Sequence, residues 1–248
     1  MRFPRLTAMA ALLVSSTAAC AAEVPPLPVN FGVLVFPAFQ ALDVFGPLDT
    51  LNMLSTLFKT NLYIIAETLD PVSTKTRSAS MNTTGSNFGE SIVPTHTFAN
   101  PPALDVLIIP GGAGTRAGTL LDPAREYIKA TFPTLQYLLT VCTGSALAAS
   151  TGILDGKNAT SNKAAWVWAT GQGPNVNWVP RARWTVDGNV WTTSGVAAGM
   201  DGTFAFVKAV YGEEAFVWIR NKVEYMPQED SHVDPWGEFY NTTWPIVS

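Results

Sequence analysis

The chain has few of the side chains that hold metals or move protons at neutral pH. Its 248 residues include two cysteines, Cys20 and Cys142, and two histidines, His96 and His232. No spacing of His, Cys and Asp resembles a set of metal ligands, so the sequence predicts no metal site. The glycines at 111–114 are not followed by Lys-Ser or Lys-Thr, which excludes a Walker phosphate loop.

Charge is also scarce. Charged residues make up 14% of the chain, the formal net charge is −4, and Lys and Arg form no cluster. Nucleic acid is therefore not an expected partner. Hydrophobic residues make up 47%, which excludes a disordered chain and indicates a full core.

No apolar run near the N-terminus is long enough to cross a membrane. The run Leu6–Val14 follows a basic start, Met1–Arg5, and precedes the small residues Ser15–Ala22. This order is typical of a secretory signal peptide. We expect residues 1–22 to be removed by cleavage near Ala22, residues 23–28 to form a linker, and the mature protein to be secreted without a membrane anchor.

Cleavage would remove Cys20 and leave Cys142 as the one thiol, so that no internal disulfide can form. The alternative is a lipoprotein leader acylated at Cys20, although the preceding residues lack the usual leucine. Acceptor sequons at Asn82, Asn158 and Asn241 agree with secretion and predict glycosylation, but such triplets also occur by chance.

Strand-like apolar runs alternate with helical patterns along the chain. This alternation predicts one α/β domain over residues 29–225, with a doubly wound, mostly parallel sheet between helices, and a tail at 226–248 that wraps the surface. The predicted strands are Val29–Phe36, Asn61–Thr68, Asp105–Pro110 and Tyr137–Val141, with hairpins over Ser73–Ser91 and Asn177–Thr193; the predicted helices are Ala41–Leu57, Asp122–Thr131 (N-cap Asp122), Lys163–Thr170, Ala197–Val210 and Glu213–Tyr225.

One stretch has the pattern of a nucleophile elbow. The apolar run Tyr137–Val141 breaks at Cys142-Thr143-Gly144-Ser145 and continues into an Ala- and Leu-rich helical stretch. Such a turn lifts its side chain above the sheet at the positive end of a helix, which favours a thiolate. Cys142 is therefore a candidate nucleophile; the alternative is a small buried hydrophobic residue.

Two other predicted strand ends carry unusual residues. Asp43 follows the first strand, and Gly111-Gly112 follows the strand Asp105–Pro110. Ligands gather at the carboxyl ends of the strands in such sheets, so these residues could meet Cys142 in one pocket. Asp43 would handle protons, or else stabilise a helix N-terminus. The double glycine would present N–H groups to an oxyanion, or else form a simple turn.

The remaining candidates are Thr143 and the two histidines. Thr143 could give its backbone N–H to an oxyanion hole and its hydroxyl to a substrate; the alternative is helix capping. A Cys/His pair is the usual arrangement of a thiol hydrolase. His96 precedes a strand and His232 lies in the tail, however, so neither falls at a strand end beside the elbow.

Four motifs in this order resemble the ThiJ/PfpI superfamily, which has the class I glutamine amidotransferase-like, flavodoxin-like fold. The resemblance runs from about Val29 to Tyr225. The motifs are F-G-V-L-V-F-P-A-F-Q-A-L-D-V-F-G-P-L, L-D-V-L-I-I-P-G-G, V-C-T-G-S-A-L-A-A-S-T-G-I-L-D-G-K-N-A-T and T-T-S-G-V-A-A-G-M-D.

The L-D-V-x-G-P and C-T-G-S segments are similar to those of the isonitrile hydratase branch. That resemblance implies hydration of an isonitrile to an N-substituted formamide through a thioimidate, without metal or cofactor, in a homodimer. It implies that Cys142 is the nucleophile, that Asp43 holds the thiol and moves protons, that Thr143 supplies the adjacent hydroxyl, and that Gly112 supplies a backbone N–H.

The chain also departs from the superfamily pattern. Asn162 stands where many members carry a histidine, which argues against a protease or amidotransferase triad, and Asp43 replaces the glutamate of the glyoxalases. Two alternatives stay open: a ligand-binding or redox-sensing protein without catalysis, and a glyoxalase- or peptidase-like hydrolase, which would need a histidine near Cys142.

Overall fold

The computed structural model describes residues 26–76 and 78–243. The predicted signal peptide, with Cys20 and the cleavage position near Ala22, lies outside the described residues. The predicted domain and most of the tail lie within them.

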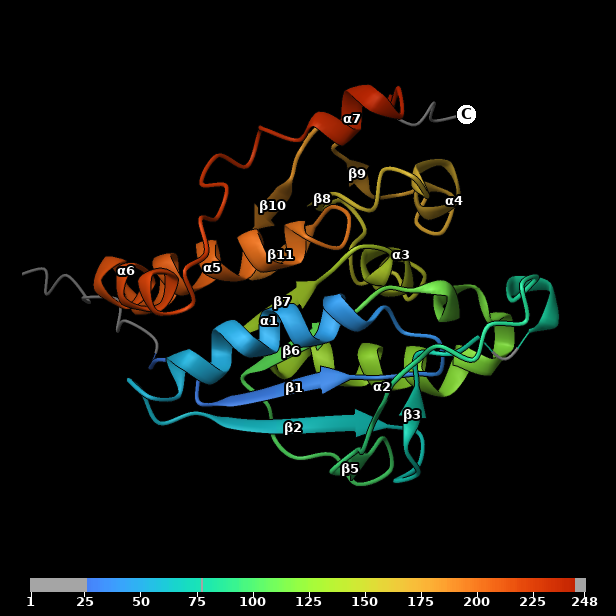
Figure 1. The fold of residues 1–248 in the computed structure, drawn as a ribbon, viewed down its shortest axis with the longest axis horizontal. Helices are drawn as coiled ribbons and strands as arrows, with labels where there is room; N and C mark the ends of the chain where they lie inside the picture. The colour runs from blue at the N-terminus through green and yellow to red at the C-terminus, as the bar shows by residue number, and fades with distance from the viewer. Residues whose placement is uncertain (1–25, 77, 244–248) are drawn as a thin grey trace, which may run out of the picture.

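A seven-stranded sheet forms the centre of the molecule (Figure 1). Its order is β10-β11-β7-β6-β1-β2-β5, and every neighbouring pair is parallel except β10 with β11. This confirms the predicted single α/β domain with a mostly parallel sheet. The strands are β1 (Asn30–Leu34), β2 (Asn61–Ala66), β5 (His96–Thr97), β6 (Val106–Ile109), β7 (Tyr137–Thr140), β10 (Trp184–Asp187) and β11 (Val190–Thr193).

The predicted hairpins are shorter than expected. Strand β9 (Asn177–Trp178) pairs in parallel with β8 (Asn158–Ala159), so the second hairpin contains only β10 and β11, joined at Gly188 with φ 61°. Pro180, which has no N–H to donate, separates β9 from β10. In the first predicted hairpin, β3 (Val72–Ser73) pairs with β4 (Ser91–Ile92), and the described residues between them, 74–76 and 78–90, are mostly exposed.

The described part of the chain contains seven α-helices. The right-handed crossovers from β1 to β2 and from β6 to β7 run in opposite directions, which places α1 and α2 on opposite faces. Helices α5 and α6 pack against α1 (Figure 1). The helices are α1 (Ala41–Leu54), α2 (Asp122–Thr131), α3 (Gly144–Ala149), α4 (Trp166–Thr170), α5 (Ala198–Tyr211), α6 (Glu213–Lys222) and α7 (Pro235–Phe239).

One local prediction, the N-cap of α2, is wrong. Asp122 is the first residue of α2 rather than its N-cap, which is Leu121. The carboxylate of Asp122 instead pairs with Arg125 at 2.7 Å. The tail also contains the helix α7, which is only five residues long and therefore too short to show a helical period.

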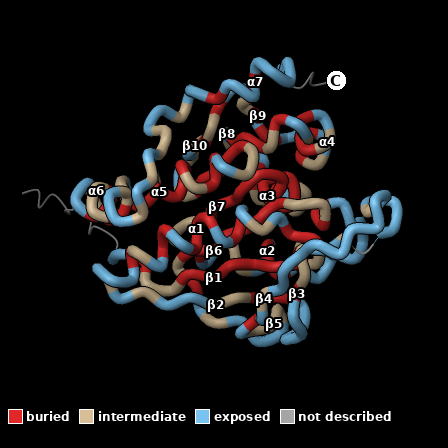
Figure 2. Tube along the Cα trace, in the orientation of Figure 1, coloured by how far each residue is buried: buried red, intermediate tan, exposed pale blue. Residues whose placement is uncertain are grey.

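The core lies along the central strands (Figure 2). All four residues of β6 and all six of α3 are buried. Helices cover both faces of this sheet, which explains the continuous apolar runs of its strands. Burying a Leu, Ile or Val side chain contributes about 1.5–3 kcal/mol to the free energy of folding. The buried strands therefore hold the segments that follow them in fixed positions.

In the sheet, β2 lies beside one edge of β1, whereas β6 and then β7 lie beside its other edge. This change of direction opens a crevice at the carboxyl ends of the strands. The segments after β1, β6 and β7 therefore meet at one edge of the sheet. These segments contain Asp43, Gly111-Gly112 and Cys142.

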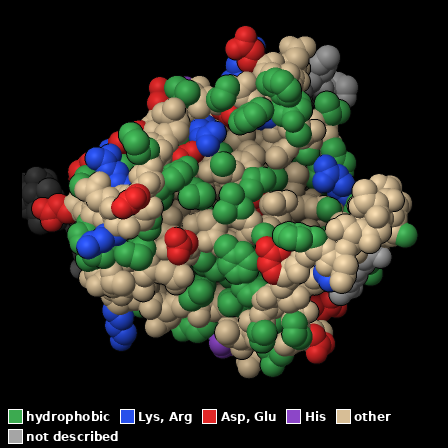
Figure 3. Space-filling view, in the orientation of Figure 1, with side chains coloured by type: hydrophobic (Ala, Val, Ile, Leu, Met, Phe, Trp, Pro, Cys, Tyr) green, Lys and Arg blue, Asp and Glu red, His purple; other side chains and the backbone are tan. Residues whose placement is uncertain are grey.

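On the face seen in Figure 3, Lys and Arg side chains lie singly among acidic and hydrophobic ones. Within residues 26–76 and 78–243, no helix has the length and apolar character needed to cross a bilayer.

Candidate active site

Cys142 occupies a strained turn between β7 and α3. Its φ is 58°, and its backbone N–H donates to the carbonyl of Ser194 at 3.0 Å. Positive φ is uncommon for a residue with a Cβ and marks a position that the surrounding structure enforces. Gly144 allows the close approach, because a Cβ there would collide with the carbonyl of Ile109 in β6. The predicted strand–turn–helix is thus present.

Asp43 lies in the first turn of α1, is fully buried, and faces this turn. Its Oδ2 accepts the backbone N–H of Gly111 at 2.8 Å. Its Oδ1 is buried without a hydrogen bond of ordinary geometry, and the neighbouring Cys142 thiol is close enough to stabilise the carboxylate. Burial raises the pKa of Asp43 to about 7, while Gly111 and Cys142 partly oppose that rise.

The same surroundings keep Cys142 protonated at rest. Burial raises the pKa of the thiol, and the negative charge of Asp43 raises it further. Burial and the charge of Asp43 therefore oppose the thiolate that the helix N-terminus was expected to favour. The two groups share one proton, and their titration belongs to the pair.

Gly111 and Gly112 hold the site together rather than leaving an oxyanion hole open. The Gly111 N–H is bound to Asp43, and the Gly112 N–H donates to Thr143 Oγ1 at 3.1 Å. A Cβ on Gly111 would lie 2.5 Å from the Thr143 backbone nitrogen and 2.9 Å from Asp43 Oδ2. Both N–H groups are occupied, so the expected role of these glycines as oxyanion donors is not what the structure shows.

The backbone N–H and the hydroxyl of Thr143 both lower the pKa of the neighbouring Cys142 thiol, although burial outweighs them. The hydroxyl is held by Gly112 and by Thr115, whose Oγ1 lies 3.1 Å from Thr143 Oγ1 and 2.7 Å from the carbonyl of Gly112. Donation by Thr143 to an oxyanion hole and to a substrate stays a prediction; the sequence did not point to Thr115.

Asn162 lies on the segment that folds back toward the elbow after α3, where its Oδ1 accepts the backbone N–H of Ala165 at 3.0 Å. Its side chain lowers the pKa of the Cys142 thiol, against the larger effect of burial. The neighbouring Ser161 hydroxyl donates to the carbonyl of Cys142 at 3.0 Å. The sequence showed only that Asn162 stands at a position often occupied by histidine; the contact depends on how the chain folds back after α3.

Neither histidine reaches this site. His96 lies in β5 rather than before a strand, and three strands separate β5 from β7. At about 4.8 Å per strand, this corresponds to roughly 19 Å. The side chain of His232 is 88% exposed, with Nδ1 3.2 Å from Asp230.

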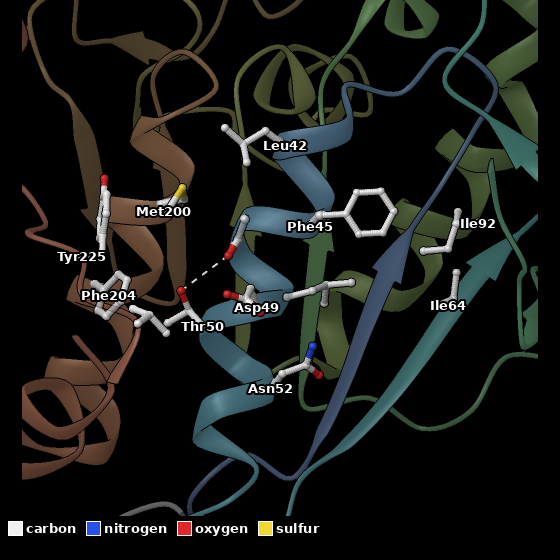
Figure 4. Close-up of a pocket in the computed structure, with 13 residues that line it drawn as sticks. Leu42, Phe45, Asp49, Thr50, Asn52, Ile64, Ile92, Met200, Phe204 and Tyr225 are labelled. Atoms are coloured by element: carbon white, nitrogen blue, oxygen red, sulfur yellow. Dashed lines mark hydrogen bonds between the residues drawn. The ribbon is translucent and has the colours of Figure 1, made fainter. Parts of the chain in front are cut away.

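The site is almost closed to solvent. The thiol residue Cys142 is 6% exposed, and Asp43 is 0% exposed. An apolar groove of about 590 Å³ lies nearby on the outer side of α1, between Met200 and Phe204 on α5 and Ile64 on β2 (Figure 4). Neither Asp43 nor Cys142 lines it, so the groove is a surface feature separate from the thiol.

The three sequon asparagines differ in exposure. Asn158 and Asn241 are exposed, whereas Asn82 is half-buried and its amide exchanges two hydrogen bonds of 2.9 Å with the backbone of Ser86. Among the residues that the structure describes, no three His, Cys, Asp or Glu side chains are grouped in a way that could hold a metal ion.

Comparison with known proteins places this geometry in context. The sequence is 30% identical over 202 residues to an isonitrile hydratase of Pseudomonas putida, covering 80% of this chain and 79% of that protein. The fold is similar to a crystal structure of a ThiJ/PfpI family protein from Pseudomonas syringae, with a TM-score of 0.67, 28% identity, and coverage of 87% of this chain and 83% of that one.

A more distant structure shares the fold alone. DJ-1beta of Drosophila melanogaster aligns with a TM-score of 0.63 and 16% identity over 80% of this chain and 98% of its own. The sequence model of the DJ-1/PfpI family matches residues 31–209, which include the whole of the site described above. With its elbow cysteine, its mostly parallel sheet and this match across most of its length, the chain belongs to the DJ-1/PfpI family.

Proposed function

We propose that this protein hydrates isonitriles to N-substituted formamides, using Cys142 as the nucleophile and Asp43 as the proton carrier. The observation that carries the proposal is that Asp43 and Cys142 are buried in one site, with neither His96 nor His232 beside them. The similarity to the Pseudomonas putida isonitrile hydratase supports the substrate class.

The first half of the reaction uses the proton that the pair already holds. The Asp43 carboxylate takes the thiol proton as the sulfur attacks the terminal carbon of R–N≡C, and the carboxylic acid then delivers that proton to the same carbon. The product is a thioimidate, R–N=CH–S, on Cys142, with Asp43 again ionised. The Asp43 pKa of about 7 suits a group that both accepts and donates near neutral pH.

The second half uses a water molecule. Asp43 accepts a proton from water as the hydroxyl adds to the thioimidate carbon, and that proton passes to the nitrogen. The tetrahedral intermediate then expels the sulfur, the hydroxyl proton returns to the pair, and R–NH–CHO leaves. One isonitrile and one water give one formamide, and no leaving group other than Cys142 needs protonation.

The narrow access to the thiol fits this substrate class. A residue that is 6% exposed can be reached by a slender, linear group more readily than by a branched amide or ester. A peptidase-like hydrolase would also need an acid for its leaving amine, and neither histidine is placed to act as one. A peroxide sensor favours an accessible thiolate, whereas this thiol is buried and neutral.

The test is the conversion of a simple alkyl isonitrile by the purified protein. We expect the N-alkylformamide to appear in proton NMR spectra with the wild type and not with Cys142→Ser. Asn175→Ala, which alters an exposed amide 3.2 Å from Asp155, serves as the control that should retain full activity. Absence of formamide with the wild type would reject the isonitrile as substrate.

We also propose that the protein is secreted after cleavage near Ala22, that it is glycosylated, and that it acts as a homodimer. The leader pattern, the exposure of Asn158 and Asn241, and the exposed Leu42 and Phe45 on α1 support these statements. N-terminal sequencing, glycosidase treatment and light scattering of the secreted product test them separately. Secretion after cleavage would be contradicted by an N-terminal sequence that retains the leader. Glycosylation would be contradicted by an unchanged mass after glycosidase, and a homodimer by a monomer mass in light scattering.

A further inference from the structure

We propose that Lys163 is a positioning residue for the nucleophile. Its buried ammonium holds the segment that contains Ser161, and the hydroxyl of Ser161 in turn holds the backbone carbonyl of Cys142. In its bearing on isonitrile turnover the inference rests on the proposed function, but the contacts themselves concern the geometry of the elbow.

The backbone of Cys142 is held on both sides. Its N–H donates to the carbonyl of Ser194 at 3.0 Å. Its carbonyl accepts the hydroxyls of Ser145 and Ser161, each at 3.0 Å. Ser145 belongs to α3 and moves with the elbow, whereas Ser161 lies 19 residues beyond Cys142. A residue with a φ of 58° needs such outside contacts to keep its conformation, so Ser161 helps to enforce the strained turn.

Ser161 is itself fixed by the ammonium of Lys163. An ammonium has three N–H groups, and three acceptors surround this one. They are the carbonyl of Ser161 at 3.2 Å, the carbonyl of Ala182 at 2.9 Å and the hydroxyl of Thr160. Lys163 therefore joins the segment beside the nucleophile to the segment that leads into β10.

The counter-charge that allows this lysine to be buried comes from the C-terminal tail. Asp234 Oδ2 lies 3.6 Å from Lys163 Nζ, and the ring of Trp166 lies with its centroid 4.8 Å from the same atom. Asp234 is the N-cap of α7, where its carboxylate accepts the N–H of Trp236. The tail thus stabilises a cation that orders the residues next to the elbow.

A second connection runs from the tail to the other side of the elbow. The carbonyl of Ser231 accepts the N–H of Arg183 at 2.7 Å. The carbonyl of Arg183 accepts the N–H of Ser194 at 2.8 Å, and Ser194 is the acceptor of the Cys142 N–H. Ala182, which the ammonium also holds, precedes Arg183. The two connections therefore meet, and the tail holds the Cys142 peptide from both sides.

This arrangement has a consequence for the reaction. The thiol must lie at a fixed height and direction relative to Asp43, and a displacement of about 1 Å can slow a reaction by about a hundredfold. Loss of the Lys163 contacts should release the carbonyl of Cys142 on one side. We expect a lower kcat with KM little changed, because none of these contacts involves the substrate.

The double change Lys163→Met with Asp234→Asn separates positioning from charge. It removes the ammonium and its counter-charge together, so that no buried charge is left unpaired, and asparagine can still accept the N–H of Trp236. The measurement is hydrogen–deuterium exchange of the folded protein, followed by mass spectrometry on peptides covering 137–150 and 30–34. Because a buried hydrogen bond is worth about tenfold, we expect exchange at 137–150 to accelerate by about tenfold, with 30–34 unchanged.

Ser161→Ala is an independent arm, since it removes only the hydroxyl and leaves the ion pair intact. It should accelerate exchange at 137–150 in the same way, and it decides the question if the double variant does not fold. The matched control is Lys157→Met with Asp187→Asn, which removes a pair 3.8 Å apart. Asp187 pairs with Val190 at the start of β11, at the other end of that strand from the elbow, so the control should exchange like the wild type.

Exchange at the wild-type rate over 137–150 in both folded Lys163→Met with Asp234→Asn and Ser161→Ala would overturn the inference. Equal acceleration over 137–150 and 30–34 would also overturn it, because it would show an effect on global stability alone. The exchange measurement contains no isonitrile. A failure of the proposed function, seen as no formamide with the wild type, is therefore distinguishable from a failure here.

Discussion

At the scale of single residues, Asp43 is subject to two opposing requirements. The proposed reaction needs a carboxylate beside the thiol, but full burial disfavours the charged form. The Gly111 N–H offsets only part of that cost. Asp43 is thus a residue at which stability and activity should move in opposite directions.

The change Asp43→Asn should therefore stabilise the protein above neutral pH. The folded-state pKa of about 7 lies above the ordinary value of 3.8, so the carboxyl favours folding below about pH 4, and this contribution is lost as pH rises toward 7. At about 1.4 kcal/mol per pKa unit, the loss amounts to at most roughly 4 kcal/mol. Urea unfolding at pH 8 should show the variant to be more stable, with the difference shrinking toward pH 4; equal stability at both pH values would contradict this account.

The same pKa predicts the pH dependence of catalysis. The proposed reaction starts with Asp43 ionised and Cys142 protonated, so kcat/KM should rise with pH through about 7 and then level off, because the pKa of the thiol lies far higher. Initial rates of formamide production between pH 5 and 9 measure this. A profile that is flat through pH 7 would show that Asp43 is not the proton carrier.

The sequence allowed part of this site to be predicted. Cys142 and Asp43 both follow buried strands, so fold topology alone brings them together. The roles of Gly112 and Asn162 depend on which of several possible partners each polar group meets. Local sequence does not specify that the Gly112 N–H binds Thr143, or that Asn162 Oδ1 accepts the N–H of Ala165.

At the scale of elements, the packing of α3 against β6 determines where Cys142 lies relative to the sheet. All of α3 is buried, and the elbow begins where Gly144 passes the carbonyl of Ile109. Gly144→Ala should shift the helix and destabilise the protein by about 1–3 kcal/mol, with a parallel loss of activity.

Gly171→Ala is the matched control for this change. A Cβ there would come no closer than 3.5 Å to any neighbour, and the residue is exposed at the end of α4. Chemical denaturation of the two variants should separate them clearly. If Gly144→Ala unfolds at the same denaturant concentration as the wild type, the packing of α3 on β6 does not constrain the elbow.

Long apolar elements were predictable, and short ones were not. The runs that became β1, β6 and β7 are strongly apolar because helices cover both of their faces. Strands β8 and β9 have two residues each, and α7 has five, so their formation depends on tertiary partners rather than on periodicity.

At the scale of the whole molecule, the tail after α6 is anchored to the domain through a buried ion pair. Lys163 Nζ lies 3.6 Å from Asp234 Oδ2, and these side chains are 1% and 0% exposed. Burial lowers the pKa of Lys163 to about 8, while Asp234 opposes that shift. The tail is held further by Thr242, whose hydroxyl donates to the carbonyl of Pro180 at 2.8 Å.

Removing one member of the pair should therefore lower the free energy of unfolding by more than the intact ion pair adds to it. Asp234→Ala leaves a buried ammonium without its counter-charge and should destabilise the protein by about 3–5 kcal/mol. Asp230→Ala, in the exposed part of the same tail, should have little effect. Thermal melts of both variants check this, and a melt of Asp234→Ala that overlays the wild type would show that the tail is not anchored by this pair.

The central claim is that Cys142 forms a covalent bond to the isonitrile carbon during hydration. The most direct measurement is mass spectrometry of protein quenched with acid during turnover of an alkyl isonitrile, with the modified peptide mapped. The account predicts a mass increase equal to one isonitrile on the Cys142 peptide of the wild type, and none on Cys142→Ser. Formamide production at the wild-type rate by Cys142→Ser, with no adduct on Cys142 in the wild type, would contradict it.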